Sequence, residues 1–497
     1  MTELSGEPFD LLVIGGGITG CGVARDAAMR GLRVALVERD DFASGTSGRS
    51  SRLIHGGIRY LENAQLHLVH EAIRERQTLL RIAPHLVKPL AFTWPLYRGA
   101  RVGKLKLAAG LFVYDLMAAG RSRRHFALDA AGTLQREPSL RPEGLEGGAV
   151  YYDAATDDTR LTLANALAAR EHGAVVVNHA TVTSILRHQD RATGAIVARN
   201  GATEDVRARV ILNATGVWEN NFTTEERARR LRGSKGVHIS VARERIGNRE
   251  ALTLISPLDG RVMFCLPAGS QTIIGTTDTW TSESPDAVRA DRSDVDYLLG
   301  SINHYFPRAG LTRADVASAW AGIRPLASGG AKSPGRISRE HSIVVDDSGI
   351  VEVTGGKLTT YRSMAAEIVD LVQSRLGRER RPSTTDSVAL PGAGREAAIA
   401  QLGRENAELA KPLVPGLGYT GAHLTYGVTN EMALTLSDLL IRRTHIAFET
   451  RDHGRAIAPV AADLVAPLLR WTPDEKSAQL RAYAAEVERM FSIAGDY

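Results

Sequence analysis

The chain of 497 residues is long enough for two or three domains with sizeable cores. Its apolar fraction of 43% and charged fraction of 24% are ordinary for a soluble globular protein, and its net charge is +5. The two cysteines, Cys21 and Cys265, lie in unrelated segments and exclude a disulfide framework or a cysteine-rich metal site. Because the N-terminus is also polar and acidic, unlike a signal peptide, we expect a reducing, cytoplasmic compartment.

The first forty residues predict a strand, a glycine-rich turn, a helix and a second strand. Residues 9–14 form a buried apolar run, and residues 15–20 follow it as a G-x-G-x-x-G turn that opens a helix. Residues 33–37 then form a second apolar run that ends on Glu38. This order is the context that a dinucleotide-binding fingerprint requires.

Each glycine of this fingerprint has an expected task. Gly15 permits the tight turn, Gly17 lets the backbone approach a pyrophosphate, and Gly20 lets helix and strand pack closely. The pyrophosphate would lie on the unpaired N–H groups of the helix N-terminus, and Glu38 would accept hydrogen bonds from a ribose. We therefore predict a bound dinucleotide.

A loop rich in small and hydroxyl side chains follows at residues 44–52. Its hydroxyl groups, among them Thr46, Ser47, Ser50 and Ser51, suit a cofactor that continues in an extended form beyond the pyrophosphate, as FAD does. Taken alone, the same loop also reads as a flexible polar segment.

The segment 98–124 combines an apolar run with basic ends. The run at residues 107–120 is shorter than the roughly 20 apolar residues that a bilayer-spanning helix needs, and Asp115 interrupts it. Its basic neighbours are Arg98, Arg101, Lys104, Lys106, Arg121, Arg123 and Arg124. A helix here could lie in a membrane interface, or it could bury the same face in the core of the protein.

The middle of the chain predicts two different sheets. Residues 151–218 return to the nucleotide-binding pattern, with a helix at 160–173 and strands that end in a glycine turn at 213–216. Between residues 233 and 334, strands such as 237–241 and 272–275 suggest a more antiparallel sheet that would form the floor of a substrate domain.

The C-terminal part begins with a second glycine-rich junction. Residues 353–361 place Gly355 and Gly356 between a strand and a helix, where N–H groups and the helix dipole could face an electron-rich flavin edge. A Pro/Gly linker at 389–394 follows. Beyond it, helical periodicity at 456–469 and 474–493 predicts an all-helical cap.

Six segments together resemble the FAD-dependent glycerol-3-phosphate dehydrogenases, a branch of the D-amino-acid-oxidase-like flavoproteins. They occur in the family's order, cover residues from about 8 to 372, and are 14–20, 53–60, 213–218, 274–278, 321–326 and 355–361. The tail beyond 390 resembles the family's helical C-terminal region more loosely.

The resemblance implies an α/β fold with a discontinuous Rossmann-like FAD-binding domain, a mixed or antiparallel substrate domain and a helical C-terminal domain. The expected boundaries are 1–90, 150–232 and 341–375 for the FAD domain, 91–149 and 233–340 for the substrate domain, and 390–497 for the helical domain.

For FAD, the fingerprint and the resemblance together give one set of candidate contacts. They are Gly15, Gly17, Gly20, Glu38, Thr46, Ser47, Ser50, Ser51, His55, Gly56, Gly57, Val182, Ala214, Gly216, Trp218, Gly355, Gly356, Lys357, Leu358 and Thr359.

The implied reaction is oxidation of sn-glycerol 3-phosphate to dihydroxyacetone phosphate, with quinone as the final acceptor and no metal. Arg and Lys side chains suit a phosphate clamp because they donate charge-assisted hydrogen bonds. The candidate substrate contacts are Arg59, Tyr60, Lys235, Arg324, Arg339, Lys357 and Thr359.

The catalytic candidates are His238, His55 and Arg324. A histidine can take the C2 hydroxyl proton near neutral pH. His238 lies in a strand that resembles one lining the family's pocket. The alternative role of His55 is to orient the flavin, and Arg324 is the candidate to stabilise the developing alkoxide. Which of them is the base stays open.

The expected partners are glycerol 3-phosphate and quinone, with peripheral contact between residues 98–124 and the inner face of the cell membrane. The C-terminal helices could cap a monomer or form a homodimer. Three alternatives stay open: an oxygen-reducing glycerophosphate oxidase or a related amino-acid or hydroxy-acid oxidoreductase, a nucleic-acid-modifying flavoprotein, and a non-catalytic flavin-binding protein. The sequence shows no recognised nucleic-acid module, so we expect no nucleic-acid partner.

Overall fold

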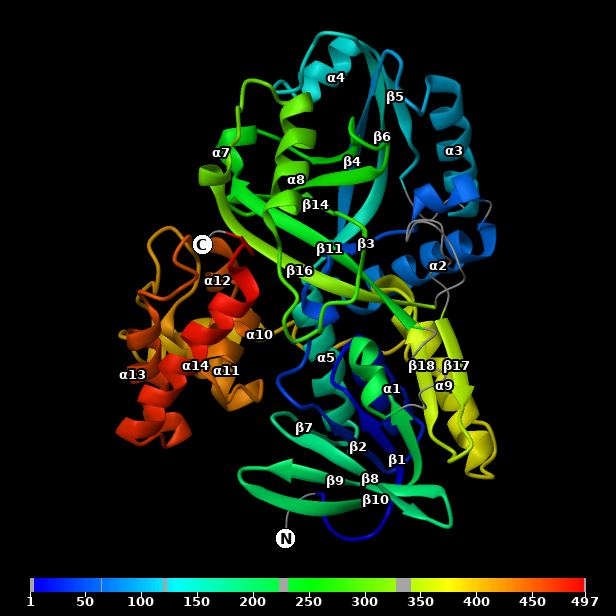
Figure 1. Ribbon diagram of the computed structural model, residues 1–497, viewed down its shortest axis with the longest axis vertical. Helices are drawn as coiled ribbons and strands as arrows, with labels where there is room; N and C mark the ends of the chain where they lie inside the picture. Colours follow the sequence, from blue (N-terminus) through cyan, green and yellow to red (C-terminus); the bar gives the residue numbers. More distant parts are fainter. Residues whose placement is uncertain (1–3, 64, 119–122, 223–230, 328–340, 496–497) are drawn as a thin grey trace.

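Two sheets and a helical domain make up the part of the chain that the computed structural model describes, residues 4–63, 65–118, 123–222, 231–327 and 341–495. Figure 1 shows the first sheet in the lower part of the molecule, the second sheet in the upper part, and the C-terminal helices on the left. This arrangement confirms the expected fold class, an α/β protein with two sheets of different kinds and a helical C-terminal domain.

The first sheet is mainly parallel and has the strand order β17-β18-β10-β1-β2-β7. Its strands are β1 (Phe9–Ile14), β2 (Val34–Val37), β7 (Val175–Val177), β8 (Thr181–His188), β9 (Arg191–Arg199), β10 (Ala202–Asn213), β17 (His341–Val345) and β18 (Val351–Gly355). The β8–β9 hairpin extends β10, and β17 is antiparallel to β18.

Both faces of this sheet are covered. Leu11 and Val13 of β1 belong to a core with α1 (Ile18–Met29), α5 (Asp158–Glu171) and α9 (Tyr361–Arg375). Leu12 and Ile14 pack instead with the β8–β9 hairpin and β10. Burial on both faces explains why residues 11–14 of β1 form a continuous apolar run and not an alternating one.

The second sheet is mainly antiparallel, as expected, and has the order β15-β11-β14-β13-β12-β4-β6-β3, with β16 on β11 and β5 on β6. Its strands are β3 (Leu53–Ile54), β4 (Val87–Tyr97), β5 (Phe126–Leu128), β6 (Leu145–Thr156), β11 (Leu231–Ala242), β12 (Ala251–Ile255), β13 (Val262–Ala268), β14 (Gln271–Gly275), β15 (Thr279–Thr281) and β16 (Val316–Ala327). Around it lie the helices α2 (Leu66–Ile82), α3 (Lys104–Met117), α4 (Ala130–Arg136), α7 (Arg243–Ile246) and α8 (Arg292–Tyr305).

The second sheet takes more of the chain than the sequence suggested. The expected domain boundary near residue 150 falls inside β6, because β6 pairs with β4 from Leu145 to Thr156. The short strand β3, from a segment assigned to the FAD domain, also pairs with β6. The hydroxyl-rich loop before β3 therefore runs from one sheet to the other.

The C-terminal domain consists of α10 (Arg395–Glu405), α11 (Gly421–Asn430), a π-helical turn at Asp438–Arg443, α12 (Ile446–Glu449), α13 (Ala458–Leu469) and α14 (Pro473–Phe491). Helices were expected at 456–469 and 474–493, where α13 and α14 lie. The domain is tied to the first sheet by buried ion pairs, in which Arg443 contacts Asp41 at 2.6 Å and Arg442 contacts the same carboxylate at 3.0 Å.

The apolar run at 107–120 forms most of α3. Among the helices of the described residues, none has both the length and the apolar character needed to cross a bilayer.

Candidate active site

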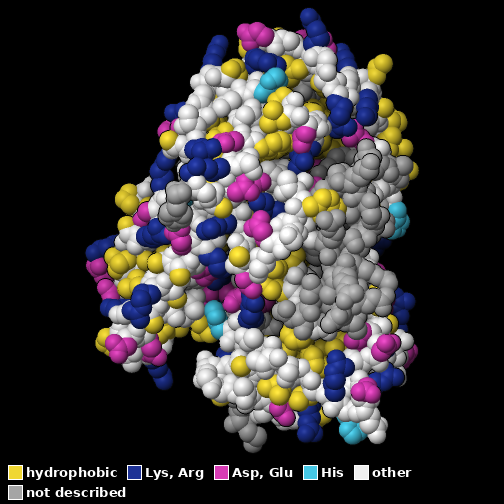
Figure 2. Space-filling view, in the orientation of Figure 1, with side chains coloured by type: hydrophobic (Ala, Val, Ile, Leu, Met, Phe, Trp, Pro, Cys, Tyr) yellow, Lys and Arg dark blue, Asp and Glu magenta, His cyan; other side chains and the backbone are white. Residues whose placement is uncertain are grey.

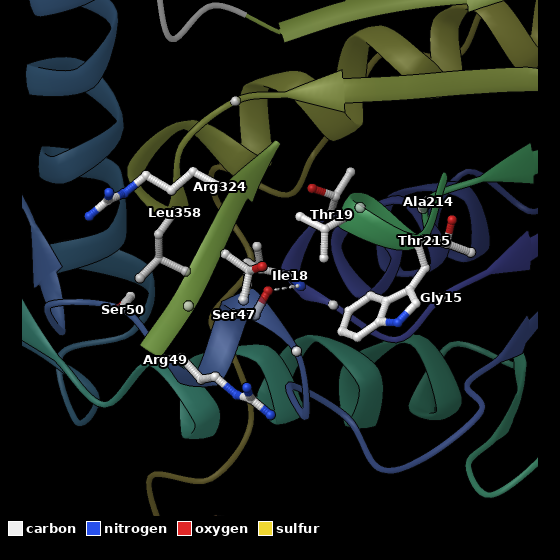
Figure 3. A pocket seen from close by; sticks show the side chains of 18 of the residues that line it. Gly15, Ile18, Thr19, Ser47, Arg49, Ser50, Ala214, Thr215, Arg324 and Leu358 are labelled. Atoms are coloured by element: carbon white, nitrogen blue, oxygen red, sulfur yellow. Dashed lines mark hydrogen bonds between the residues drawn. The ribbon is translucent and has the colours of Figure 1, made fainter. Parts of the chain in front are cut away.

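A cavity of about 510 Å³ lies where the two sheets meet. Its walls come from the β1–α1 turn, the loop after β2, strands β11 and β16, and the junction between β18 and α9. Figure 3 shows Gly15, Ala214 and Thr215 at one end, Arg324 and Leu358 at the other, and Ser47 between them. Segments separated by more than three hundred residues thus line one site.

At the first end, glycine lets three backbone segments approach one another closely. Gly15 has a φ of +110°, and a Cβ atom there would lie 2.6 Å from the carbonyl oxygen of Ala214. A Cβ atom on Gly20 would lie 1.9 Å from the carbonyl oxygen of Gly15. A side chain at either position would therefore force the turn or the helix out of place.

The N-terminus of α1 faces the same end of the cavity. Gly17 is the N-cap and supplies no side-chain cap, while the Ser47 hydroxyl accepts a hydrogen bond from the N–H of Ile18 at 2.9 Å. Gly17, Ile18 and Thr19 all line the cavity. The N–H groups of this first turn and the positive end of the helix dipole make the position suited to a phosphate.

Glu38 stands at the end of β2, in the lining of the cavity. Its carboxylate accepts backbone hydrogen bonds from Gly16 at 2.5 Å and from Asp40 at 2.8 Å. Burial raises the pKa of Glu38 to about 6. The acid thus braces the glycine turn and also lies where the sequence predicted a ribose contact.

The hydroxyl groups of the loop after β2 line the cavity and also bond to the protein. Thr46 donates to the carbonyl of Ile323 at 2.7 Å, and Ser50 donates to Asp158 at 2.6 Å. The Ser51 hydroxyl lies 2.8 Å from Nε2 of His238. These bonds fix the loop against α5 and the second sheet, so the segment is not merely a flexible polar connection.

The junction between β18 and α9 forms another wall. Gly355 and Gly356 have φ values of +79° and +90°. The Lys357 ammonium lies 3.7 Å from the centre of the Tyr60 ring, and the Thr359 hydroxyl accepts a hydrogen bond from the N–H of His55 at 3.2 Å. This geometry joins two segments whose bonded residues are 304 positions apart in the sequence.

His238 is buried in the cavity wall. Its ring stacks on Trp320 with a centroid distance of 5.5 Å and an interplanar angle of 14°, and Nδ1 has no hydrogen-bond partner among the described residues. Burial, followed by the charges of Arg324 and Arg52, lowers the pKa of His238 to about 3. The imidazole is therefore neutral near pH 7.

Arg324 reaches into the cavity from β16. Its guanidinium donates to Thr276 Oγ1 at 3.1 Å and to Asp278 Oδ1 at 3.2 Å. A Cβ atom on Gly236 would lie 2.5 Å from a guanidinium nitrogen, so a side chain there would displace the guanidinium from this position. No sequence motif singles out Thr276, Asp278 or Trp320 as a site residue, although the first two lie in a segment that carries the resemblance.

Most of the candidate residues line this cavity. They are Gly15, Gly17, Glu38, Thr46, Ser47, Ser50, Ser51, His55, Tyr60, Val182, Ala214, Gly216, Trp218, His238, Arg324, Gly355, Gly356, Lys357, Leu358 and Thr359.

Three of the glycines predicted to contact FAD do not line the cavity but lie behind its wall. Gly20 packs on the glycine turn, the N–H of Gly56 donates to Asp153 at 3.1 Å, and Gly57 has a φ of +77° beside the Tyr60 ring. Arg339 lies outside the described residues, as does the side chain of Arg59.

Lys235 does not belong to the cavity lining, contrary to expectation. Along β11 it has the opposite orientation to His238, because the two residues are three positions apart and successive side chains alternate between faces. Its ammonium contacts Asp291 at 2.7 Å and Asp294 at 2.8 Å, and these carboxylates raise the pKa of Lys235. We therefore omit it from the substrate site.

Within the described residues, Asp41, His179 and Asp438 lie close enough to share a metal ion. Both aspartates, however, already accept hydrogen bonds from guanidinium groups. Asp41 accepts from Arg442 and Arg443, and Asp438 accepts from Arg442. The group is an ion-pair network between two domains.

Comparison with known proteins gives two family matches. Residues 10–362 match the model of the FAD dependent oxidoreductases, and residues 383–476 match the C-terminal domain of alpha-glycerophosphate oxidase.

Similar proteins match over nearly the whole chain. The chain is 40% identical to glycerol-3-phosphate dehydrogenase 2 of Mycobacterium tuberculosis, covering 98% of this chain and 89% of that protein. It is 34% identical to the aerobic glycerol-3-phosphate dehydrogenase of Bacillus subtilis, covering 96% and 94%. The solved structure of the glycerol-3-phosphate dehydrogenase from Bacillus halodurans, complexed with FAD, has a TM-score of 0.80 and 31% identity, covering 100% of this chain and 97% of that one.

Proposed function

The chain belongs to the family of FAD dependent oxidoreductases that includes the glycerol-3-phosphate dehydrogenases, and we propose that it oxidises sn-glycerol 3-phosphate to dihydroxyacetone phosphate. The observation that carries the proposal is the convergence of Arg324, Lys357 and a neutral His238 on one cavity. The other end of that cavity has the glycine turn of a dinucleotide site. The names of the similar proteins support the same substrate.

FAD is the cofactor of this family, and the cavity fits it. The N-terminus of α1 would hold the pyrophosphate, Glu38 the ribose, and the β18–α9 junction the flavin. The close approach at Gly15 and the open N-cap at Gly17 are what such a molecule needs. When bound, FAD supplies the acceptor for the hydride that leaves the substrate.

Two cations lie where they can bind the phosphate group of the substrate. Arg324 offers a planar fork that is already oriented by Thr276 and Asp278, and Lys357 adds a point charge. A hydrogen bond to a charged group contributes about 1.5–3 kcal/mol. Arg59 and Arg339 remain sequence-based candidates for the same clamp.

His238 is the side chain that we assign to proton transfer. As hydride leaves C2 of the substrate, the C2 hydroxyl must lose its proton, and a neutral imidazole can accept it. The low pKa of His238 opposes this transfer, but a bound phosphate dianion would offset the charge of Arg324, which helps to lower that pKa. His55, which also lines the cavity, is the alternative base.

We propose that quinone is the electron acceptor and that the protein reaches it by binding to an anionic membrane surface. The support comes from α3, whose apolar side chains point in two directions. Leu107, Leu111 and Tyr114 are buried against the protein. Leu105, Phe112 and Leu116 are 87%, 64% and 69% exposed.

The exposed side chains recur at intervals of seven and four residues, so they share one face of the helix. Lys104 at its N-terminus is exposed, while Lys106 and Arg101 contact Glu62 at 2.8 and 3.0 Å. Figure 2 shows hydrophobic side chains along the upper right edge, where α3 lies in Figure 1, with Lys and Arg beside them. Such a helix suits the interface of an anionic bilayer.

The catalytic proposal is tested by product formation with a panel of substrates. We expect dihydroxyacetone phosphate from sn-glycerol 3-phosphate and little turnover of glycerol, glycine or proline, because these lack the phosphate that Arg324 and Lys357 would bind. Turnover that is supported by a soluble quinone and not by oxygen would support the dehydrogenase. Turnover with oxygen alone would establish an oxidase, and turnover of an unphosphorylated substrate would overturn the substrate assignment.

The membrane proposal is tested by sedimentation with vesicles of phosphatidylglycerol and phosphatidylcholine. The variant Leu105→Ser/Phe112→Ser should bind at least tenfold more weakly than the wild type, since two apolar side chains no longer enter the interface. Leu258→Ser is the control, because Leu258 is 61% exposed elsewhere on the surface. Equal binding of all three proteins would contradict the proposal.

A further inference from the structure

Phe448 of the helical C-terminal domain reaches the wall behind His238. Phe448 precedes the last residue of α12 and is 5% exposed. Its ring lies 5.2 Å from that of Trp320, at an interplanar angle of 88°. Trp320 in turn stacks on His238. Three aromatic rings thus connect the helical domain to the cavity.

The strands explain why Trp320 faces His238 directly. The two residues are opposite one another in the antiparallel pair β11–β16. Cross-strand neighbours on one face of such a pair are close enough for their rings to pack. Because Trp320 is only 1% exposed and is backed by Phe448, its ring has little freedom to tilt.

Phe448 also contacts Arg52, which follows the second support of His238 in the chain. The guanidinium of Arg52 lies over the Phe448 ring, 4.9 Å from its centre, and within 3.4 Å of Nδ1 of His445. Arg52 follows Ser51, whose hydroxyl lies 2.8 Å from Nε2 of His238. The ring of His238 is therefore held on its face by Trp320 and at its edge by Ser51. Phe448 packs against Trp320 and against Arg52, the residue after Ser51.

We propose that Phe448 is a positioning residue for His238, through which the helical domain holds the imidazole in the orientation needed for proton transfer. The inference rests on the proposed function, in which His238 takes the C2 hydroxyl proton. Phe448 does not line the cavity, so it would not touch a substrate bound there.

Loss of the Phe448 ring should allow His238, the proposed base, to move out of position. Removing the ring would leave space beside Trp320, and the stack could tilt into it. A displacement of about 1 Å at a reacting group can cost roughly 100-fold in rate. The charged groups that face His238, Arg324 and Arg52, would stay in the chain, but Arg52 would lose the ring that it packs against.

The test is anaerobic flavin reduction by sn-glycerol 3-phosphate in the full-length holoenzyme, measured for the wild type, His238→Asn, Phe448→Ala and Phe448→Leu. We expect Phe448→Ala to lower the limiting rate of reduction roughly 10- to 100-fold, with the substrate concentration at half-maximal rate changed less than threefold. Phe448→Leu fills most of the space and should lie between Phe448→Ala and the wild type. The acid limb of the pH–rate profile should move to higher pH in Phe448→Ala, because a less buried His238 regains proton affinity.

The control is Val465→Ala, which removes buried apolar volume from α13 in the same hydrophobic core. If Phe448→Ala and Val465→Ala reduce flavin at the same rate, with the same pH profile, Phe448 only stabilises the domain and the proposal is wrong. If Phe448→Ala does not bind FAD, Phe448→Leu decides by the same criteria. A normal rate of flavin reduction in His238→Asn would overturn the positioning role of Phe448 but would not affect the assignment of the substrate. If sn-glycerol 3-phosphate does not reduce the flavin of the wild type, both the proposed function and this inference are wrong.

Discussion

The two ends of the cavity are built in different ways. At the dinucleotide end, the turn from Gly15 to Gly20 supplies the close approaches within six consecutive residues. At the substrate end, His55, His238, Arg324 and Lys357 come from four separate segments that meet only in the folded protein. The first end depends on backbone geometry and the second on where side-chain charges lie.

This difference determines what each end can tolerate. A glycine turn has no room for a Cβ atom, so it is sensitive to volume and indifferent to charge. A phosphate clamp loses affinity when a charge is removed, even where the fold survives. Substitutions at the two ends should therefore have different consequences. Added volume at the glycine turn should reduce stability and FAD binding, whereas removal of a charge from the clamp should reduce substrate affinity.

The largest effect should come from Gly20→Ala. Its Cβ atom would lie 1.9 Å from the carbonyl oxygen of Gly15, a contact that only a backbone shift can relieve. We expect a loss of about 3 kcal/mol or more in stability and little bound FAD after purification, as read by the flavin absorbance per chain.

The matched control is Gly110→Ala in α3, where an added Cβ atom meets nothing within 4 Å. That variant should be more stable than the wild type by about 0.5–1 kcal/mol, since alanine favours a helix. If both variants bind FAD equally well, the turn is not sensitive to volume and the comparison fails.

Arg324→Ala should leave FAD binding intact and weaken substrate binding. The loss of a charge-assisted contact worth about 1.5–3 kcal/mol corresponds to roughly one to two decades in affinity for sn-glycerol 3-phosphate. The measurement is the substrate concentration that half-reduces the flavin in an anaerobic titration.

Arg261→Ala serves as the control for Arg324, because Arg261 donates to the carbonyl of Asp278 at 3.2 Å but does not line the cavity. It should bind substrate like the wild type. Normal substrate affinity in Arg324→Ala would remove this residue from the clamp.

His238 should make the protein sensitive to acid. Its folded-state pKa of about 3 lies below the unfolded value of about 6.5, so the unfolded chain binds a proton that the folded chain does not. The stabilisation is present above pH 6.5 and is lost as the pH falls towards 3. His238→Asn should therefore lose less stability than the wild type between pH 7 and pH 4.

Thermal denaturation across this pH range gives the measurement for His238, with the exposed His67→Asn as control. The control should follow the wild-type curve. Parallel curves for His238→Asn and the wild type would mean that His238 is not held neutral by burial.

Ser47→Ala should have the smallest effect. The hydroxyl accepts one hydrogen bond from Ile18 at the start of α1, so its removal should cost about 1 kcal/mol in denaturant unfolding and weaken FAD binding only slightly. Ser477→Ala, which removes an exposed hydroxyl that donates to the carbonyl of Pro473, should change stability by less than half as much. An equal change in the two variants would show that the Ser47 bond adds nothing specific to the site.

The sequence predicted the dinucleotide end well for a physical reason. Apolar runs fix the strands, and glycine at set spacing marks a backbone path that other residues cannot follow. The strand at Phe9–Ile14, the helix after Gly17 and the acid at the end of β2 all lie as expected.

The substrate end was harder to predict because its geometry depends on strand pairing. Lys235 and His238 are neighbours in sequence, but alternation along β11 sends Lys235 to carboxylates on the other face. Trp320 is brought opposite His238 only by the register of β16, and Phe448 arrives from a separate domain. Such contacts leave no local pattern in the amino-acid sequence.

The most direct test of the proposed function is a single-turnover experiment without oxygen. The purified yellow protein is mixed with sn-glycerol 3-phosphate and the absorbance of oxidised flavin is followed. Rapid bleaching that saturates with substrate, together with stoichiometric dihydroxyacetone phosphate, is the predicted result. A bound flavin that sn-glycerol 3-phosphate fails to bleach, while a hydroxy acid or an amino acid bleaches it, would contradict the assignment of Arg324, Lys357 and His238 to this substrate.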